Sequence, residues 1–389
     1  MLVEQCSPSG DIGSRRLESL WSHPCADRLV TRYRDLGVEL CPRSPRTPGT
    51  RGPAAPDPVG ADWGVAAVAV AAVTGLTLSG CSSSDDEASD SSSRVTLTIG
   101  DQVKSTQSLL EAAGELDNLP YDITWASFES GPPLLEAAGA GKVDFGGTGD
   151  VPPVFAQVGG APIKIVGVQA RTEPNDFLLV PDGSPARSIA DLKGKKIAFA
   201  KGSSSHGLVL ALLEQAGLEP DDIDATYLSP TEALSAFSSG QVDAWAVWNP
   251  YSTLGQAQAH AKVIADGAGL TTQQVYYLAS DQALGDARKR EALSDLLGRL
   301  TRANQWSVTH ADEWVPIFSK LTKLPEPIAR ATFATGSGPL VPIGDEQIAK
   351  QQKLIDLFAG AGEIPRAPKA ADYFDAQFNS AVTGAGVSG

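Results

Sequence analysis

Short apolar strands alternate with amphipathic helices from Arg94 onward, and this alternation occurs twice along the chain. The first unit reads as strand, helix, strand, helix and strand over 94–100, 105–116, 121–128, 131–141 and 142–149. The second unit repeats the scheme over 195–200, 205–218, 222–228, 231–240 and 241–248. Such alternation predicts an α/β fold with a largely parallel sheet. Because the order recurs about 100 residues later, we expect two similar lobes.

The boundaries of these lobes follow from the flanking segments. The pattern Gly-x-Val-Asp at 141–144 recurs at 240–243, which supports the repeat. Strands at 176–180 and 275–279 flank the second unit, and we expect them to form a two-strand hinge. The stretch after 280 is helical by period and has little strand signal, so we expect it to pack back on the first lobe. This organisation puts lobe 1 at 95–180 plus 280–389 and lobe 2 at 181–279.

Charge narrows the class of partner. The chain has 389 residues, enough for two domains, with 42% hydrophobic residues and a formal net charge of −15. Binding to nucleic acid needs a basic face, and no cluster of Lys or Arg occurs, so the sequence argues against a nucleic-acid partner. A small anion would have to be held by local donors rather than by net charge.

The cysteines are confined to the first part of the chain, at Cys6, Cys25, Cys41 and Cys81. This spacing offers neither a disulfide framework nor a metal site. We therefore expect no metal and no cofactor.

An apolar run at 64–78 has the length of a signal-peptide core and is short for a membrane span. It ends in Leu-Ser-Gly-Cys, which resembles a bacterial lipobox over 64–80 and implies lipidation of Cys81. The polar segment 81–94 then reads as a flexible tether. These features predict an exported protein anchored on the outer face of the cytoplasmic membrane. The alternative is a chance cysteine after an apolar helix.

Residues 1–63 fit poorly in front of a signal peptide, whose apolar core normally begins close to the start of the chain. We hypothesise that translation begins near 46–51 and that most of this segment is not part of the product. Detection of peptides from 1–40 would contradict this hypothesis, and the intact mass of the precursor tests it.

Three loops that precede helices carry hydroxyl groups and glycines. In an open α/β sheet, ligands bind at the carboxyl ends of strands, where free backbone N–H groups and the helix dipole favour an anion. The loops predict an anion site in a cleft between the lobes, and ordinary helix capping is the alternative reading of each. The candidate residues are Gln102, Ser105, Thr106, Thr148, Gly149, Asp150, Ser203, Ser204, Ser205 and His206.

Two tryptophans follow in the strand at 241–248. Trp245 and Trp248 lie near the end of this strand, which corresponds to the strand before Thr148 in the first lobe. Tryptophan in a strand is more often part of the core. Placed beside the polar loops, however, the pair predicts an aromatic wall for an organic anion with an apolar tail.

The segments 131–163, 188–218 and 240–251 closely resemble the aliphatic-sulfonate-binding proteins of ABC importers, within the nitrate/sulfonate/taurine-binding family. The resemblance runs from about Val95 to 365. It implies a type II periplasmic-binding-protein fold with a cleft that closes over the ligand. It also implies a monomer that delivers an alkanesulfonate to a membrane permease with its ATPase for sulfur acquisition. The family's anion-site loops fall on the three loops above.

The chain departs from the family at two positions in these loops. Lys104 stands where the family often has glycine, and Asp150 where it commonly has glutamate. The first change affects the local loop shape. The second keeps a carboxylate, which is suited to capping a helix or orienting donors rather than touching an anion, because like charges repel.

The sequence is also compatible with other functions. Ser203 and His206 could be a nucleophile and its base, but no Gly-x-Ser-x-Gly elbow accompanies them, so the sequence favours a binding protein over an enzyme. Some proteins of this fold are thiamine-pyrimidine synthases, which need a metal and a cytoplasmic location. Within binding proteins, taurine, nitrate, bicarbonate, aromatic sulfonates and thiamine precursors are the alternative ligands, since relatives of this fold bind them. Taurine would require a carboxylate facing its ammonium group.

Overall fold

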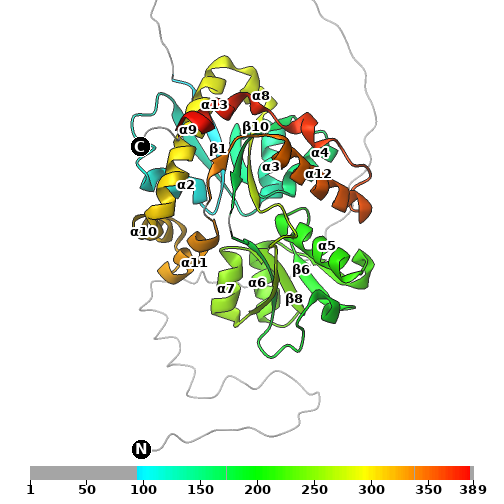
Figure 1. The fold of residues 1–389 in the computed structure, drawn as a ribbon. Helices are drawn as coiled ribbons and strands as arrows, with labels where there is room; N and C mark the ends of the chain where they lie inside the picture. Colours follow the sequence, from blue (N-terminus) through cyan, green and yellow to red (C-terminus); the bar gives the residue numbers. More distant parts are fainter. Residues whose placement is uncertain (1–93, 172, 337, 386–389) are drawn as a thin grey trace, which may run out of the picture. The chain divides into compact units, whose positions relative to one another are not determined.

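The protein is described by a computed structural model that covers residues 94–171, 173–336 and 338–385. Two mixed sheets form two α/β lobes (Figure 1). The first sheet has six strands in the order β11-β4-β10-β3-β1-β2, and the second has five in the order β7-β6-β8-β5-β9. The strands are β1 Thr96–Gln102, β2 Asp122–Phe128, β3 Phe145–Thr148, β4 Ile163–Ala170, β5 Asp176–Val180, β6 Lys196–Phe199, β7 Asp224–Tyr227, β8 Ala244–Trp248, β9 Lys262–Asp266, β10 Gln274–Ser280 and β11 Leu340–Val341.

Helices cover both sheets. The α-helices are α2 Ser105–Ala112, α3 Gly131–Gly139, α4 Pro152–Val158, α5 Ser204–Ala216, α6 Pro230–Ser238, α7 Tyr251–Ala259, α8 Asp281–Gly285, α9 Ala287–Thr309, α10 Ala311–Thr322, α11 Glu326–Gly336, α12 Asp345–Gly360 and α13 Asn379–Gly384. Short 3₁₀ helices lie at Ile189–Leu192, Pro220–Asp222, Ala370–Tyr373 and Ala376–Phe378. The second lobe, drawn in green in Figure 1, carries α5, α6 and α7.

The first lobe is built around parallel β1, β2 and β3, as strand and helix alternation predicts. β10 enters this sheet antiparallel to β3 and β4. Apolar side chains of β1 and of α9 share one core, to which Leu97, Ile99, Leu296 and Leu300 belong, all without exposed surface. Burial of these side chains holds α9, which follows the second lobe in the chain, on the first lobe, since removal of apolar surface from water is the main stabilising contribution to packing.

The second lobe repeats the parallel arrangement. β6 pairs in parallel with β7 and β8, whereas β5 runs antiparallel between β8 and β9. The apolar face of α5 packs on this sheet through Leu208, Val209, Leu212 and Leu213. Gly217 ends the helix in the left-handed conformation at φ 67°, which a glycine adopts without steric cost. The start of α5 is thereby fixed at the carboxyl end of β6.

Residues 171–175 and 267–273 connect the two sheets. The sequence instead suggested that the strands at 176–180 and 275–279 form the hinge. The structure places β5 inside the second sheet and β10 inside the first. Both strands are continuous apolar runs that are buried on both faces, so their sequence pattern does not tell which sheet they join.

The two connections contact each other. The backbone N–H of Arg171 donates to the carbonyl oxygen of Gln273 at 3.0 Å. The backbone N–H of Asn175 donates to Gln273 Oε1 at 3.2 Å. The crossing between the lobes is therefore a pair of adjacent, hydrogen-bonded segments.

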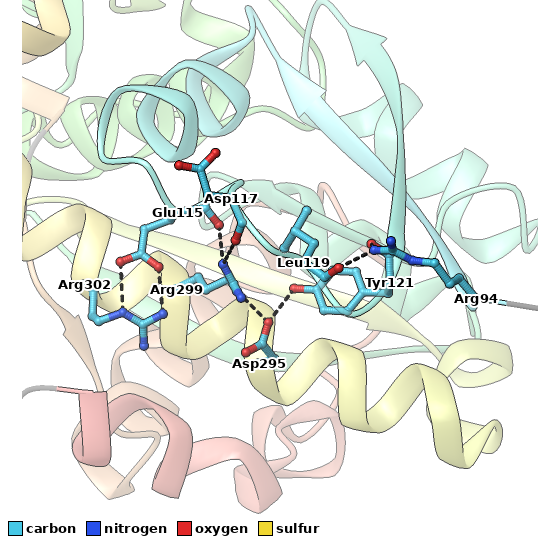
Figure 2. Close-up of polar contacts among 8 residues, drawn as sticks. All are labelled: Arg94, Glu115, Asp117, Leu119, Tyr121, Asp295, Arg299 and Arg302. Atoms are coloured by element: carbon cyan, nitrogen blue, oxygen red, sulfur yellow. Dashed lines mark hydrogen bonds and ion pairs between the residues drawn. The ribbon is translucent and has the colours of Figure 1, made fainter. Parts of the chain in front are cut away.

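A polar network ties the segment before β2 to α9 (Figure 2). Arg302 makes a two-pronged ion pair with Glu115, with N–O distances of 2.9 and 2.7 Å. Arg299 donates to the carbonyl oxygen of Glu115 at 2.7 Å and to Asp295 Oδ2 at 2.6 Å. Tyr121 donates to the same Asp295 oxygen at 3.0 Å. This network fixes α9 to the segment before β2, and none of its residues lines the pocket described below.

Several features expected from the sequence lie outside the described residues. They are the upstream segment 1–63, the signal-peptide core and lipobox at 64–80, the lipidation site Cys81, and the tether up to residue 93. Across the three described ranges, no helix combines the length and the apolar content that a membrane crossing requires.

Candidate functional site

A pocket of about 150 Å³ lies between the lobes and is lined by residues of both. We call one group of lining residues the polar part; it consists of Thr148, Gly149, Arg171, Ser203 and Ser204. We call another group the aromatic wall; it consists of Trp314 and Phe318 of α10 and Phe333 of α11. The second lobe adds Trp248, at the end of β8.

Thr148 brings a buried hydroxyl to the polar part. Its Oγ1 has no hydrogen-bond partner among the described residues. A Cβ atom on Gly131 would lie 2.2 Å from this oxygen, so the hydroxyl occupies space that only glycine leaves open at the start of α3. Because a buried polar group without a partner is costly, the Thr148 hydroxyl is a candidate donor to a bound ligand.

The start of α5 reaches the pocket from the second lobe. Ser203 Oγ donates to the carbonyl oxygen of Ala200 at 2.7 Å, and Ser204 Oγ donates to Asp176 Oδ1 at 2.6 Å. Both hydroxyl protons thus have partners within the protein. The first backbone N–H groups of a helix have no partner inside the helix and lie at the positive end of its dipole. At this position the available donors for an anion are backbone N–H groups rather than serine hydroxyls.

Arg171 supplies a positive charge at the crossing between the lobes. Its Nε is buried and has no hydrogen-bond partner in the described part of the chain. Burial lowers the pKa of the guanidinium, and interaction with the nearby acidic groups of Asp176, Tyr277 and Asp150 opposes this shift. Neither Asp176 nor Asp150 lines the pocket. An arginine held in this way is suited to pair with an anion that enters the pocket.

Two buried carboxyl groups lie behind the polar part. Burial raises the pKa of Asp176 to about 7, and the neighbouring Asp150 adds to the shift. Burial also raises the pKa of Asp150, which is opposed by hydrogen bonds from the backbone N–H and the hydroxyl of Thr272, at 3.2 and 2.7 Å. Asp176 holds the hydroxyl of the lining residue Ser204, whereas Asp150 holds Thr272, which does not line the pocket, and neither carboxyl group lies on the lining.

Comparison with known proteins places the chain in a family. A sequence model described as "NMT1/THI5 like" matches residues 130–313. An aliphatic-sulfonate-binding protein of Escherichia coli K12 is 38% identical over 281 residues, which cover 71% of this chain and 87% of the relative. The chain belongs to the aliphatic-sulfonate-binding protein family. The resemblance inferred from the residues is thereby confirmed.

Solved structures of family members share the fold. The alkanesulfonate-binding protein SsuA from Xanthomonas axonopodis pv. citri, bound to MOPS, matches with a TM-score of 0.67 and 35% identity, over 72% of this chain and 98% of that chain. The periplasmic aliphatic sulphonate binding protein SsuA from Escherichia coli matches with a TM-score of 0.64 and 35% identity, over 72% of this chain and 92% of that chain. These matches confirm the expected periplasmic-binding-protein fold.

Twelve residues were predicted from the sequence to contact the ligand, and eight of them line the pocket between the lobes. They are Gln102, Ser105, Thr106, Thr148, Gly149, Ser203, Ser204 and Trp248. The remaining four, Asp150, Ser205, His206 and Trp245, do not line it.

The loop before α2 differs from the sequence expectation in its chemistry. Asp101 accepts hydrogen bonds from the backbone N–H groups of Thr106 and Gln107 at 3.1 and 2.8 Å, and from Ser105 Oγ at 3.3 Å. Gln102 Nε2 donates to the carbonyl oxygen of Gly147 at 2.9 Å. A carboxylate of the chain therefore already occupies the start of α2, and this helix start is not free for a second anion.

His206 is sealed away from the pocket. It is 1% exposed and packs against the rings of Phe199 and Phe358, with ring centroids 5.1 and 5.0 Å away. Its Nδ1 accepts a hydrogen bond from the backbone N–H of Gly202 at 3.3 Å. Burial, helped by the charge of Lys201, lowers the pKa of His206 to about 4. The imidazole is thus neutral near pH 7 and supports the helix start from within the core.

The other three residues, Trp245, Ser205 and Asp150, make contacts inside the protein rather than with the pocket. Trp245 is 1% exposed and packs against Phe237 in the core of the second lobe. Ser205 is fully buried, with its Oγ 2.8 Å from Ser203 Oγ. Asp150 caps the turn at Thr272, as described above. Within the residues that the structure describes, no three His, Cys, Asp or Glu side chains are arranged to hold a metal ion.

Proposed function

We propose that this chain is the substrate-binding component of an ABC importer and that it binds an aliphatic or related organic sulfonate in the interlobe pocket. The observation that carries the proposal is Arg171, whose buried Nε has no partner in the described residues and whose side chain lines the pocket. Membership in the aliphatic-sulfonate-binding family supports the same ligand class.

The donors of the polar part fit a sulfonate. A sulfonate has three acceptor oxygens and stays ionised near neutral pH. Arg171, the Thr148 hydroxyl and the backbone N–H groups at the start of α5 are three separate sources of donors on one lining. Each charge-assisted hydrogen bond stabilises a complex by about 1.5–3 kcal/mol. After the costs of desolvation and lobe closure, three or four such bonds are compatible with micromolar binding, roughly −8 kcal/mol.

The lining favours this ligand over the alternatives. No Asp or Glu occurs among the lining residues, which all lie in the described ranges, so the ammonium group of taurine would have no counter-charge. Nitrate has no tail to cover the aromatic wall. An uncharged thiamine precursor would leave the Arg171 guanidinium without a counter-charge. The proposal is binding rather than catalysis, because the nucleophile reading relied on His206, which is enclosed by aromatic rings.

We further propose that the protein is exported, anchored to the outer face of the membrane through a lipid on Cys81, and that it works as a monomer with a permease and its ATPase in sulfur acquisition. The lipobox-like run before Cys81 supports anchoring, and relatives described as periplasmic support export. Membrane fractionation of the wild type and of Cys81→Ser tests the anchor: we expect the wild type in the membrane fraction and the variant in the soluble fraction.

A thermal-shift screen tests the ligand class. We would measure the unfolding temperature of the purified protein with alkanesulfonates, taurine, nitrate and thiamine precursors. A ligand at 100 times its dissociation constant stabilises a protein by about 2.7 kcal/mol. We expect a shift with alkanesulfonates and a smaller one or none with the others. A shift with another compound but not with sulfonates would reject the ligand and leave the binding-protein assignment in place.

A further inference from the structure

The aromatic wall defines a second chemical environment in the pocket. Trp314 and Phe333 make an edge-to-face contact with ring centroids 5.1 Å apart, and Trp314 and Phe318 lie 6.0 Å apart. These rings come from the first lobe, whereas Trp248 comes from the second. Asn249 Nδ2 donates to Thr335 Oγ1 at 2.7 Å, which holds the residue after Trp248 against α11. An occupant of the pocket is therefore in reach of aromatic rings from both lobes.

Polar groups near the wall are already paired inside the protein. Trp314 Nε1 donates to Ser108 Oγ at 3.2 Å. Thr332 Oγ1 donates to the carbonyl oxygen of Ile328 at 2.8 Å, and Ser307 Oγ to that of Asn304 at 2.8 Å. The wall thus offers apolar contact and little hydrogen bonding. A charged or strongly polar tail would lose its hydration there without compensation.

The pocket has room for more than a sulfonate group. Its volume of about 150 Å³ is well above the roughly 10–15 Å³ that a single water molecule needs. The space beyond the polar part is bounded by the aromatic wall and by Trp248. A tail attached to the sulfonate group would therefore lie against aromatic rings.

Resting on the proposed sulfonate-binding function, we infer that the preferred ligand is a sulfonate with an uncharged, ring-sized apolar tail, an arenesulfonate rather than a short alkanesulfonate or taurine, and that Trp248 and Trp314 set this preference. An aromatic tail gains both from the removal of apolar surface from water and from ring contacts. Methanesulfonate fills only the polar part and leaves the wall in contact with water.

Titration calorimetry with benzenesulfonate, methanesulfonate and taurine tests the inference on the intact protein. We expect benzenesulfonate to bind at least tenfold more tightly than methanesulfonate, and taurine to bind more weakly than benzenesulfonate by at least the same factor. A preference below tenfold, or the reverse order, overturns the inference while the proposed function stands. If no sulfonate binds, the proposed function fails and the inference fails with it.

Variants assign the preference to particular residues. Trp248→Ala should weaken benzenesulfonate binding at least tenfold and change methanesulfonate binding less than threefold, whereas Trp248→Phe should keep most of the preference. Trp306→Ala is the matched control, because Trp306 stacks on His310 at 4.8 Å and does not line the pocket. If Trp248→Ala weakens the binding of benzenesulfonate and methanesulfonate equally, and Trp248→Phe binds the two ligands with equal affinity, then Trp248 does not contribute to recognition of the tail. Thermal melting of each variant verifies that it is folded.

Discussion

Ser204 Oγ donates a hydrogen bond of 2.6 Å to Asp176 Oδ1, and this contact joins the first residue of α5 to the first residue of β5. Ser204 lines the pocket, whereas Asp176 lies behind it and is 5% exposed. The serine therefore acts as a link between the helix start and a buried carboxyl group. Its role is to position the backbone N–H groups of α5, because its own proton is already donated.

The raised pKa of Asp176 gives the folded protein a specific pH dependence. Burial raises this pKa from 3.8 to about 7. Between these two values the folded state holds a proton that the unfolded state has lost, so this group's contribution to stability decreases as pH rises from 4 to 7. Asp176→Asn removes the contribution. We expect the unfolding temperature of the variant, measured relative to that of the wild type, to increase as the pH is raised from 5 to 8.

The contribution of Asp176 is isolated by the difference in melting temperature between Asp176→Asn and the wild type at each pH, because other groups also titrate in the wild type. Asp101, whose pKa burial raises to about 6, acts in the same direction. His206, whose pKa burial lowers to about 4, acts in the opposite direction between pH 4 and 6.5. The exposed Asp224→Asn in the same lobe serves as a control. If the melting temperatures of Asp176→Asn and the wild type stay parallel from pH 5 to 8, Asp176 does not titrate as described.

Arg171 is predicted to provide a large share of the binding free energy. Arg171→Met should weaken sulfonate binding about 100-fold, since it removes two or more charge-assisted hydrogen bonds of about 1.5–3 kcal/mol each, less the desolvation that the wild type incurs. Arg171→Lys should recover part of the affinity, because an ammonium keeps the charge and loses the planar fork of donors. Calorimetry measures both. If the sulfonate affinity of Arg171→Met lies within threefold of the wild-type value, Arg171 does not contact the ligand.

Close approach of the lobes at Gly149 is also testable. A Cβ atom on Gly149, in the first lobe, would lie 3.2 Å from Cβ and 3.4 Å from Oγ of Ser204, in the second. Gly149→Ala should therefore hinder closure and reduce sulfonate affinity several-fold, with little change in the melting temperature of the free protein. Gly360→Ala is the control, because nothing lies within 4 Å of its added Cβ. Unchanged affinity in Gly149→Ala would mean that this contact does not limit closure.

His206 is predicted to affect stability and not binding. His206→Leu keeps the apolar packing but removes the acceptor of the Gly202 N–H, which costs about 1–3 kcal/mol for a buried donor left without a partner. We expect a lower melting temperature and a sulfonate affinity within twofold of the wild type. If a folded His206→Leu variant loses more than tenfold in sulfonate affinity, His206 takes part in ligand binding.

The fold and the general location of the site were predictable from local patterns. Period and order of the apolar segments predicted the two α/β lobes, and the loops before α4 and α5 indicated Thr148 and Ser204. The sequence also held an unused signal at β8: Trp245 and Trp248 are three residues apart in a strand, which puts them on opposite faces. One therefore belongs to the core and the other to the pocket.

Two residues at the site could not be selected from the sequence. Arg171 is a single basic residue directly after the apolar strand β4. Its place on the pocket lining depends on the crossing between the lobes, where its backbone N–H donates to the carbonyl oxygen of Gln273 in the other connecting segment. Asp101 lies at the end of β1 and reaches forward to the backbone of Thr106 and Gln107, a contact that depends on the left-handed turn at Val103 and Lys104. Both depend on geometry that local residue types do not encode.

The position of the bound sulfonate group tests the central claim most directly. A crystal structure of the protein with 1-butanesulfonate, with the ligand sulfur located by its anomalous scattering, gives this position. We predict the sulfur in the polar part, with sulfonate oxygens within hydrogen-bond distance of the Arg171 guanidinium and of Thr148 Oγ1. A sulfur peak among the rings of the aromatic wall, or outside the pocket, would contradict the account.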